Sequence, residues 1–334
     1  MPPKPRSKST PQQASSLLNA ISFVGSVIKD KGAAFETHVC LRNQWASGTN
    51  GVLSAGHKID EQLEAYPQNA LLKAALEKCS EMLSITLLET NRLSIKSGSF
   101  KALVPCVEGD LMHFIEPDPP VAVIDDRFKK ALETVGVLAA ENAQSVVTAS
   151  ILMNGFSLIA TDRKFIMEAW HGIDLPPGLT LPKAFVGPLT KAKKPLTGFG
   201  FSDASATFYF EDGSWLKTQT YADVYPDLNG LLNKQSNMWN VPDKFFEAIK
   251  AIEPFSDDGN IYFDTGFLRS HASDTVGASF EIAGTPKGVV YPARYLNMLN
   301  GLADKIDFIT PHGNAYCLTF QGENARGVIA GRAN

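Results

Sequence analysis

The sequence predicts an α+β protein made of three similar units in tandem. Tyr66-Pro67, Leu181-Pro182 and Tyr291-Pro292 each stand before an amphipathic segment, and proline suits the first turn of a helix, where its missing N–H costs nothing. The three prolines are spaced by about 110 residues, which is the size of a domain. A second amphipathic helix is predicted at the start of each unit, and short strands follow every helix.

The helix that opens each unit is predicted from apolar periodicity. In the second unit, Phe128, Leu132 and Val135 recur at the spacing of one helix face. In the third unit, Phe245 and Ile249 do the same. Each unit is therefore predicted to consist of two helices packed on a mostly antiparallel sheet.

The strands are predicted from alternating apolar residues, and two stretches separate the units. The clearest hairpin is 91–105, in which Ser97-Gly98 divides two alternating runs. Residues 117–120 (Pro-Asp-Pro-Pro) continue neither a helix nor a central strand, and residues 237–242 form the second boundary. The predicted organisation is a basic disordered arm over 1–14, followed by domains over 15–118, 119–240 and 241–334.

Composition is that of a soluble globular protein. Of the 334 residues, 44% are hydrophobic and 20% are charged. No stretch approaches the roughly 18 apolar residues that a membrane helix needs. The scattered Cys40, Cys79, Cys106 and Cys317 predict free thiols of a reducing cytoplasm. Because the net charge is −4, a nucleic-acid partner would require the cations to gather on one face.

No motif of a nucleotide-binding enzyme, a zinc protease or a serine hydrolase is present. His171 near Asp174 could form an acid–base pair, but such pairs are common by chance. Asp257-Asp258 and Asp125-Asp126 could suggest a metal, yet a loop turn and a helix N-cap explain them better, and Asp243 is a similar N-cap. The sequence therefore predicts a protein that is not an enzyme and has neither metal nor cofactor.

Four segments together resemble the bacterial β sliding clamp, the DNA clamp of DNA polymerase III. Residues 159–162 (Ile-Ala-Thr-Asp) are similar to the family's Ala-Thr-Asp-Gly turn, and 211–227 to its strand that ends in Phe-Pro-Asp-Tyr. Residues 91–99 are similar to the Arg-Ser-Gly-Arg hairpin, and 291–300 to the last inner helix. The order and domain-scale spacing of these segments make the combination specific, from about residue 15 to the C-terminus.

Two segments depart from the family's pattern. The family's Gly-His-Arg after the middle-domain Asp is Arg163-Lys164-Phe165 here. The family's C-terminal Met-Pro-Met-Arg-Leu is replaced by residues 329–334. A phage-encoded or otherwise divergent clamp would fit these differences.

The resemblance implies a replication processivity factor of the bacterial cytoplasm. It implies a homodimeric ring around duplex DNA, with helices inside and sheets outside, to which a polymerase and a clamp loader bind through linear motifs. Edge strands of the first and third units would close the ring, with 91–105 and 263–273 as candidates. Because topology retains such a ring, weak sequence-independent phosphate contacts suffice.

Cations on the predicted helices are the candidate DNA contacts, although lysine is also a common solvated helix residue. The basic arm, with Lys4, Arg6 and Lys8, is a further candidate, with a plain tail as the simpler interpretation. The helix candidates are Lys29, Lys31, Lys73, Lys78, Arg127, Lys129, Lys130, Lys183, Lys191, Lys193, Lys194, Lys244, Lys250 and Arg294.

The resemblance also implies an apolar pocket for partner peptides, between the middle and last units. An ordinary core position is an equally good explanation for Val147, Ile166 and Leu231 taken singly. Carried over by position, the pocket wall is Val147, Thr161, Lys164, Phe165, Ile166, Pro226, Leu231, Val328 and Ile329.

Two other functions stay open from the sequence. A non-replicative ring or scaffold of the same fold would lack positive charge on its inner helices. An unrelated α+β enzyme would contain a deep pocket with a buried carboxylate or histidine.

Overall fold

The computed structural model describes residues 12–80, 82–112, 114–313 and 315–333. Within these ranges, no helix is long and apolar enough to cross a membrane. Of the arm predicted over residues 1–14, residues 12–14 are instead structured, because β1 (Gln12–Gln13) pairs with a neighbouring strand and Ala14 begins a helix. Three basic residues of the arm lie outside the described residues: Lys4, Arg6 and Lys8.

The chain folds into two compact units, and each unit draws on two segments of the sequence. Unit 1 comprises Met1–Asp126 and Ala184–Tyr221, and unit 2 comprises Arg127–Lys183 and Ala222–Asn334. The middle domain predicted over 119–240 is thus divided between the two units. The three-domain division stays a prediction.

Unit 1 contains a seven-stranded antiparallel sheet that crosses the predicted boundary at residue 118. The crossing occurs where Ala55 pairs with Leu216 and Gly56 with Trp215. In sheet order, the strands are β2 (Cys40–Arg42), β3 (Trp45–Thr49), β4 (Leu53–Lys58), β15 (Trp215–Gln219), β14 (Ser205–Phe210), β13 (Leu196–Ser202) and β8 (Pro120–Ala122).

The predicted linker at 117–120 is fixed to this sheet through Asp118. Its buried carboxylate accepts hydrogen bonds from Thr207 Oγ1 at 2.8 Å and from Ser205 Oγ at 3.0 Å, and it forms an ion pair with Lys217 Nζ at 3.0 Å. Burial acts to raise the pKa of Asp118, but the bonds from Lys217, Thr207 and Ser205 outweigh it and lower that pKa. The linker is therefore a braced connection and not a free hinge.

A four-stranded sheet completes the β structure of unit 1, in the order β1-β5-β6-β7. The predicted hairpin is confirmed, since Ser97 pairs with Phe100 around Gly98, whose φ is 56°. The helix predicted after Pro67 is present and ends before Met82, where a strand begins. The strands are β5 (Met82–Leu87), β6 (Arg92–Ser97) and β7 (Phe100–Pro105).

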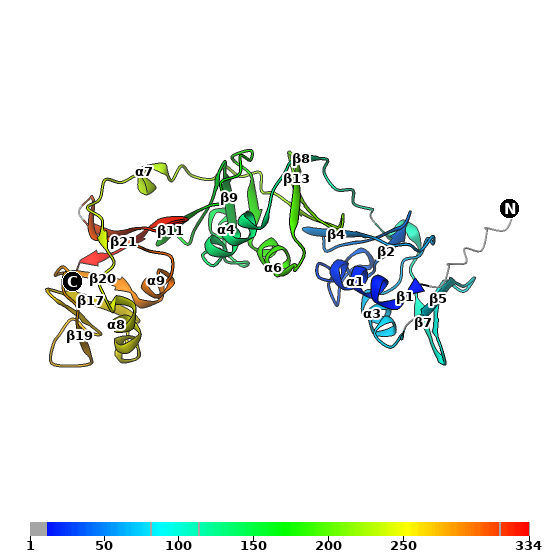
Figure 1. Ribbon diagram of the computed structural model, residues 1–334, viewed down its shortest axis with the longest axis horizontal. Coiled ribbons are helices and arrows are strands. Elements are labelled where there is room, and N and C mark those ends of the chain that lie inside the picture. The colour runs from blue at the N-terminus through cyan, green and yellow to red at the C-terminus, as the bar shows by residue number, and fades with distance from the viewer. Residues whose placement is uncertain (1–11, 81, 113, 314, 334) are drawn as a thin grey trace. The chain divides into compact units, whose positions relative to one another are not determined.

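Helices α1, α3 and α6 of unit 1 lie on one side of its seven-stranded sheet (Figure 1). Leu17, Ile21 and Val24 form the buried face of the first of them, at the expected three-to-four spacing. The helices are α1 (Ala14–Val24), α2 (Ala34–Thr37), α3 (Asn69–Leu76), the 3₁₀ turn η1 (Gly109–Leu111) and, except for its first residue, α6 (Lys183–Lys191).

Unit 2 contains an eight-stranded antiparallel sheet that crosses the second predicted boundary. The crossing occurs where Phe165 pairs with Ile329 and Ile166 with Val328. In sheet order, the strands are β12 (Thr180–Pro182), β9 (Ser150–Asn154), β10 (Ser157–Thr161), β11 (Phe165–Trp170), β23 (Ala325–Ala330), β22 (Ala315–Gln321), β21 (Lys305–His312) and β16 (Trp239–Asn240).

A five-stranded sheet completes the β structure of unit 2. The edge predicted over 263–273 is wrong, because β17 and β18 within it each have two partners, and the edge on that side is β19. In sheet order, the strands are β19 (Ser279–Glu281), β18 (Phe267–Arg269), β17 (Asn260–Asp264), β20 (Val289–Pro292) and β24 (Arg332–Ala333).

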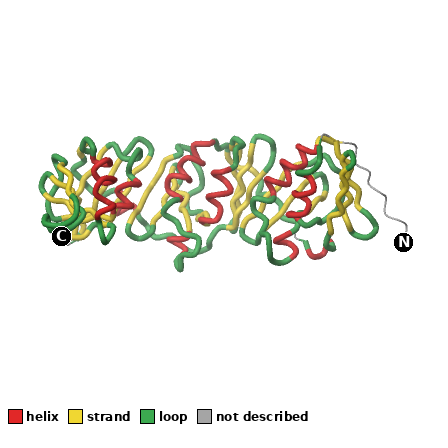
Figure 2. The backbone as a smooth tube through the Cα atoms, turned by 90° about the horizontal axis from the view of Figure 1, so that it is seen from below, coloured by secondary structure: helices red, strands yellow, loops and turns green. Residues whose placement is uncertain are grey.

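The helices of unit 2 lie on both sides of its eight-stranded sheet. The helices of unit 2 are α4 (Asp126–Gly136, from Arg127 on), α5 (Val146–Ala149), α7 (Asn229–Leu232), α8 (Phe245–Ile252), the 3₁₀ turn η2 (Glu253–Phe255) and α9 (Ala293–Met298). Figure 1 shows α7 on the opposite side of this sheet from α4 and α9, and Figure 2 shows the helices of the α4 and α9 side from below. The apolar faces predicted for α4 and α8 are buried, but Asp243 is not a cap, since Lys244 precedes α8 with φ 61°.

Candidate functional site

An apolar cluster lies on the α7 side of the eight-stranded sheet. Strands β9, β10 and β11 supply its floor, and the α7 segment covers part of it. Three partly buried leucines leave apolar surface at its margin. The buried members are Ile159, Ile166 and Leu232, and the partly buried ones are Leu152, Leu228 and Leu231.

Strand register decides which predicted pocket residues face this cluster. Thr161 pairs with Ile166, and Ile166 pairs with Val328 on the other side. Residues paired directly across a sheet share a face, so these three side chains project toward α7. Phe165 and Ile329 are paired with each other and therefore project the other way.

The prediction that Phe165 and Ile329 line the pocket is therefore wrong. The Phe165 ring lies 5.5 Å from the ring of Tyr295 in α9 and 5.9 Å from that of Phe320. Both Phe165 and Ile329 are fully buried on that side. The pocket residues carried over from the family by position include neighbours along a strand. Because side chains alternate between the two faces of a sheet, only every second residue can face a given surface.

The structure brings most of the other predicted pocket residues to the cluster. Leu231 belongs to it, and Pro226 is exposed just before α7. Val147 is half-buried on α5, and its carbonyl accepts a hydrogen bond from the Tyr225 hydroxyl at 3.3 Å. Sequence reasoning missed Leu152, Ile159, Leu228 and Leu232, although alternation from Thr161 would have found Ile159.

A buried ion pair braces α7 against the sheet beside the cluster. Arg326 Nε lies 2.7 Å from Glu168 Oε2, and the other carboxylate oxygen accepts a hydrogen bond from Ser157 Oγ at 2.6 Å. The same guanidinium donates to Asn233 Oδ1 at 2.8 Å, at the residue after α7. The Arg326 side chain thus links the sheet beneath the cluster to the end of α7.

The turn between β10 and β11 borders the cluster and carries two cations. Asp162 Oδ1 accepts the Lys164 N–H at 3.0 Å and the Phe165 N–H at 2.9 Å, which fixes the turn. Arg163 within it has φ 76°, a left-handed conformation that favours glycine. The side chains of Arg163 and Lys164 are both exposed.

Eight of the predicted DNA contacts are exposed lysines, and none of the eight has an ion pair with another residue that the structure describes. Long, solvated cations of this kind are free to meet phosphates. They are Lys31, Lys73, Lys78, Lys130, Lys191, Lys193, Lys244 and Lys250.

Four other predicted contacts have partners within the fold. Lys29 pairs with Glu36, and Lys183 Nζ donates to the Gly136 carbonyl at 2.7 Å. Arg294 lies over the Tyr295 ring and 3.7 Å from Asp162 Oδ2, and Lys194 pairs with Asp212. These four side chains stabilise the fold, so they are weaker candidates for DNA contacts than the eight lysines. The remaining two, Arg127 and Lys129, are exposed and half-buried respectively.

Lys194 belongs to a polar hub in unit 1. Its Nζ lies 2.5 Å from Asp212 Oδ2 and 4.3 Å from the centre of the Phe23 ring of α1. His57 Nε2 lies 3.2 Å from the same carboxylate, and Ser214 Oγ donates to it at 2.6 Å. Burial acts to raise the pKa of Asp212, but the hydrogen bonds from Lys194 and Ser214 outweigh it and lower that pKa to about 2.

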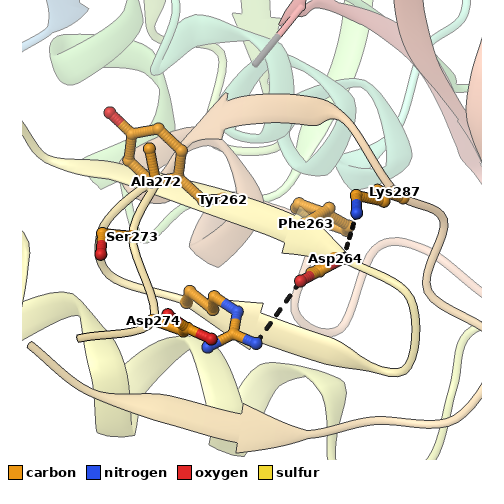
Figure 3. A pocket seen from close by; sticks show the side chains of 8 residues that line it. Tyr262, Phe263, Asp264, Ala272, Ser273, Asp274 and Lys287 are labelled. Carbon is orange, nitrogen blue, oxygen red and sulfur yellow. Dashed lines mark hydrogen bonds and ion pairs between the residues drawn. The ribbon is translucent and has the colours of Figure 1, made fainter. Parts of the chain in front are cut away.

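A polar hollow of about 220 Å³ lies over β17 and β18 in unit 2 (Figure 3). Its two cations are engaged, since Arg269 lies 3.4 Å and Lys287 3.8 Å from the Asp264 carboxylate. Tyr262 and Asp274 also line it. The hollow is small, and both of its cations already pair with Asp264.

Two of the residues considered for enzyme chemistry, His171 and Asp258, have structural partners. His171 is buried against the Phe128 ring, and its Nδ1 accepts the Ile173 N–H at 3.2 Å. Asp258 accepts hydrogen bonds from Tyr262 and Arg332, both at 2.8 Å. The four cysteines are free, as predicted. In the described part of the chain, no group of three or more His, Cys, Asp or Glu is placed to hold a metal ion.

No protein-family model matches the chain, and no curated protein matches it. Solved structures do match over nearly its whole length. The DNA polymerase III subunit beta of Pseudomonas aeruginosa is 13% identical, with a TM-score of 0.79, over 96% of this chain and 98% of that one. The chain has the DNA-clamp fold.

Two further clamps show the same extent of similarity. The sliding clamp of Bacillus subtilis is 12% identical, with a TM-score of 0.79, over 97% of this chain and 99% of that one. The beta clamp of Helicobacter pylori, solved with a bound DNA ligase peptide, is 14% identical, with a TM-score of 0.76, over 96% and 98%. The α+β clamp fold predicted from the sequence is confirmed by these matches.

Proposed function

We propose that this protein is a DNA sliding clamp, which encircles duplex DNA and tethers a polymerase to it. One observation carries the proposal: the clamp fold extends over 96% of this chain and 98% of a DNA polymerase III beta subunit. Homodimerisation and the partners, a polymerase and a clamp loader, are parts of the proposal.

The exposed helix lysines support the DNA-binding part. A sliding protein needs contacts with phosphates and none with bases, because base contacts would hold it at one sequence. Lys73 on α3, Lys130 on α4, Lys191 on α6 and Lys250 on α8 are solvated cations of this kind. With a net charge of −4, the chain gathers these cations on helices while the whole molecule stays acidic.

Ring closure would use the open sheet edges of two copies. β7 ends the four-stranded sheet of unit 1, and β19 ends the five-stranded sheet of unit 2. Unpaired edge strands present N–H and C=O groups that another strand can satisfy. Pairing of β7 from one copy with β19 from another would join two chains head to tail, and two such junctions close a ring.

The apolar cluster supports the tethering part. Leu152, Leu228 and Leu231 are only partly buried, so a peptide can cover them. Each apolar peptide side chain buried there would contribute about 1.5–3 kcal/mol before the cost of ordering the peptide. Two or three anchors are enough for a reversible tether.

The test is retention on DNA by topology. The protein is incubated with linear duplex DNA, both ends are then blocked with biotin and streptavidin, and the DNA is washed at about 0.5 M salt, where phosphate contacts are screened. A clamp stays bound and is released when the DNA is cut between the blocks. Loss during the wash, or retention that survives cutting, contradicts the proposal.

Solution mass supplies a second readout. Light scattering is expected to give about 72 kDa, twice the 36.2 kDa of one chain. A ring of that mass that is never retained on blocked DNA would instead indicate a scaffold with the clamp fold.

A further inference from the structure

The turn between β10 and β11 places a lysine directly beside the apolar cluster. The Lys164 carbonyl accepts the Ala330 N–H at 2.7 Å, so Lys164 continues the register of β11 against β23. Because side chains alternate along a strand, Lys164 projects from the same face as Ile166, two residues further on. That face is the one on which the cluster lies.

A second cation stands next to it in a conformation that costs free energy. Arg163 has φ 76°, which any residue other than glycine adopts at a penalty. Backbone strain of this kind clusters at binding sites and functional turns. Arg163 and Lys164 are exposed, and neither has an ion pair with a residue in the described part of the chain.

The acids around this turn are already engaged. Asp162 accepts the N–H groups of Lys164 and Phe165 and the hydroxyl of Tyr295. Glu168 is held by Arg326. Asp227, just before α7, is an exposed acid whose carboxylate accepts the Asn229 N–H at 2.9 Å.

We propose that the cluster selects peptides in which a carboxylate directly follows the bulky apolar anchors, with Lys164 and Arg163 binding that carboxylate. The carboxylate is either an acidic side chain or the C-terminal end of the partner, since both offer the same two oxygens to an ammonium or guanidinium group. This inference rests on the proposed peptide-binding function.

Nucleic acid is the less favoured anion for these two cations. Lys164 projects to the α7 side of the eight-stranded sheet, whereas α8 and α9, with Lys250 and Arg294, belong to the other side, where Tyr295 of α9 packs against Phe165 (Figure 1). An apolar floor also suits side chains of a peptide better than a phosphate backbone.

Three short peptides, two of seven residues and one of eight, test the proposal by isothermal titration calorimetry on the full chain. The first is Ser-Gly-Ser-Leu-Ser-Leu-Phe with a free C-terminus, the second is the same peptide with a C-terminal amide, and the third is the amide with Glu added after Phe. At about 50 mM salt, the two peptides with a carboxylate are expected to bind about fivefold more tightly than the plain amide. If only the free acid binds more tightly than the plain amide, the ligand is a C-terminal carboxylate. If the Glu peptide binds as tightly as the free acid, the ligand is any carboxylate.

Two substitutions link the preference to the turn. In the double variant Arg163→Gly, Lys164→Met the affinities for acid and amide peptides are expected to converge. Glycine relieves the backbone at position 163, so the variant is expected to fold at least as well as the parent chain. Leu231→Asp, which places a charge in the cluster, is expected to abolish binding of all three peptides.

The outcomes separate this inference from the function on which it rests. Equal affinity of acid and amide peptides for the parent chain overturns the carboxylate preference and leaves the peptide site standing. Absence of binding by all three peptides, or binding that survives Leu231→Asp, overturns the site and the preference together. Displacement of the bound peptide by a short DNA duplex overturns the choice of a carboxylate as the ligand.

Discussion

Arg326 Nε lies 2.7 Å from Glu168 Oε2, and this pair joins β23 to β11 beside the apolar cluster. The Glu168 side chain is 4% exposed and that of Arg326 is 27% exposed. The arginine therefore neutralises a buried charge and, through Asn233, also holds the end of α7. The pair is a joint between segments that the sequence predicts to be separate domains.

Replacing Arg326 by Met is expected to destabilise unit 2 by about 3 kcal/mol, because Glu168 would stay buried without its partner. Urea unfolding followed by circular dichroism measures this loss. The double variant Glu168→Gln, Arg326→Met is expected to recover most of it. If the double variant is as unstable as the single one, the loss comes from packing and not from the buried charge.

Asp118→Ala is expected to destabilise unit 1 by about 2 kcal/mol. The change leaves Thr207, Ser205 and Lys217 without the acceptor that they share. Asp203→Ala is the matched control, since Asp203 is exposed in a turn next to the same sheet and is expected to change stability by less than about 0.5 kcal/mol. Equal effects from the two substitutions would show that the linker is not braced by Asp118.

Asp212 predicts a loss of stability in acid. Its pKa is lowered from 3.8 to about 2 in the folded chain, so the folded state favours the charged carboxylate. The contribution is therefore fully present above about pH 4 and is lost as the pH falls toward 2. Thermal unfolding across this range is expected to fall less steeply with pH for Asp212→Asn than for the parent chain, and parallel curves would contradict the assignment.

Charge reversal on α6 and just after it is expected to weaken DNA binding. Lys191→Glu, Lys193→Glu should lower the dependence of log K on log salt by about 2, roughly one for each phosphate that the variant no longer neutralises. Lys96→Glu, Lys305→Glu changes the net charge equally on exposed strand positions and serves as the control. If both double variants bind DNA alike, overall charge governs binding and the helix lysines have no special part.

Residue patterns were sufficient to predict tandem α+β units, because their signals are local, and the resemblance of four segments to the sliding clamps then implied the clamp fold. Apolar spacing located α4 and α8, and Ser97-Gly98 located the β6–β7 hairpin. Helix length was less predictable, since α3 ends at Leu76 although the residues that follow are good helix formers. Tertiary pairing of β5 with β6 decides that boundary.

The candidate site was only partly predictable. Similar motifs identified the turn at Asp162 and the leucine at 231, but only strand register shows that Phe165 and Ile329 face away from the cluster. Leu152 and Leu228 carry no local signal, because they meet the cluster through the folding of β9 and α7. The ion pair between Glu168 and Arg326 joins residues on either side of a predicted boundary, so no local pattern could have found it.

The pairing of β4 with β15 has a consequence for synthesis on the ribosome. Gly56 finds its partner Trp215 about 160 residues later, which takes roughly 8–30 s at typical rates of translation. Throughout that interval, the outer edge of β4 is an open template for strands of other nascent chains. Crowded polysomes are therefore the place where this protein is most exposed to misassembly, and a holdase that covers β4 would be of most use before residue 219 emerges.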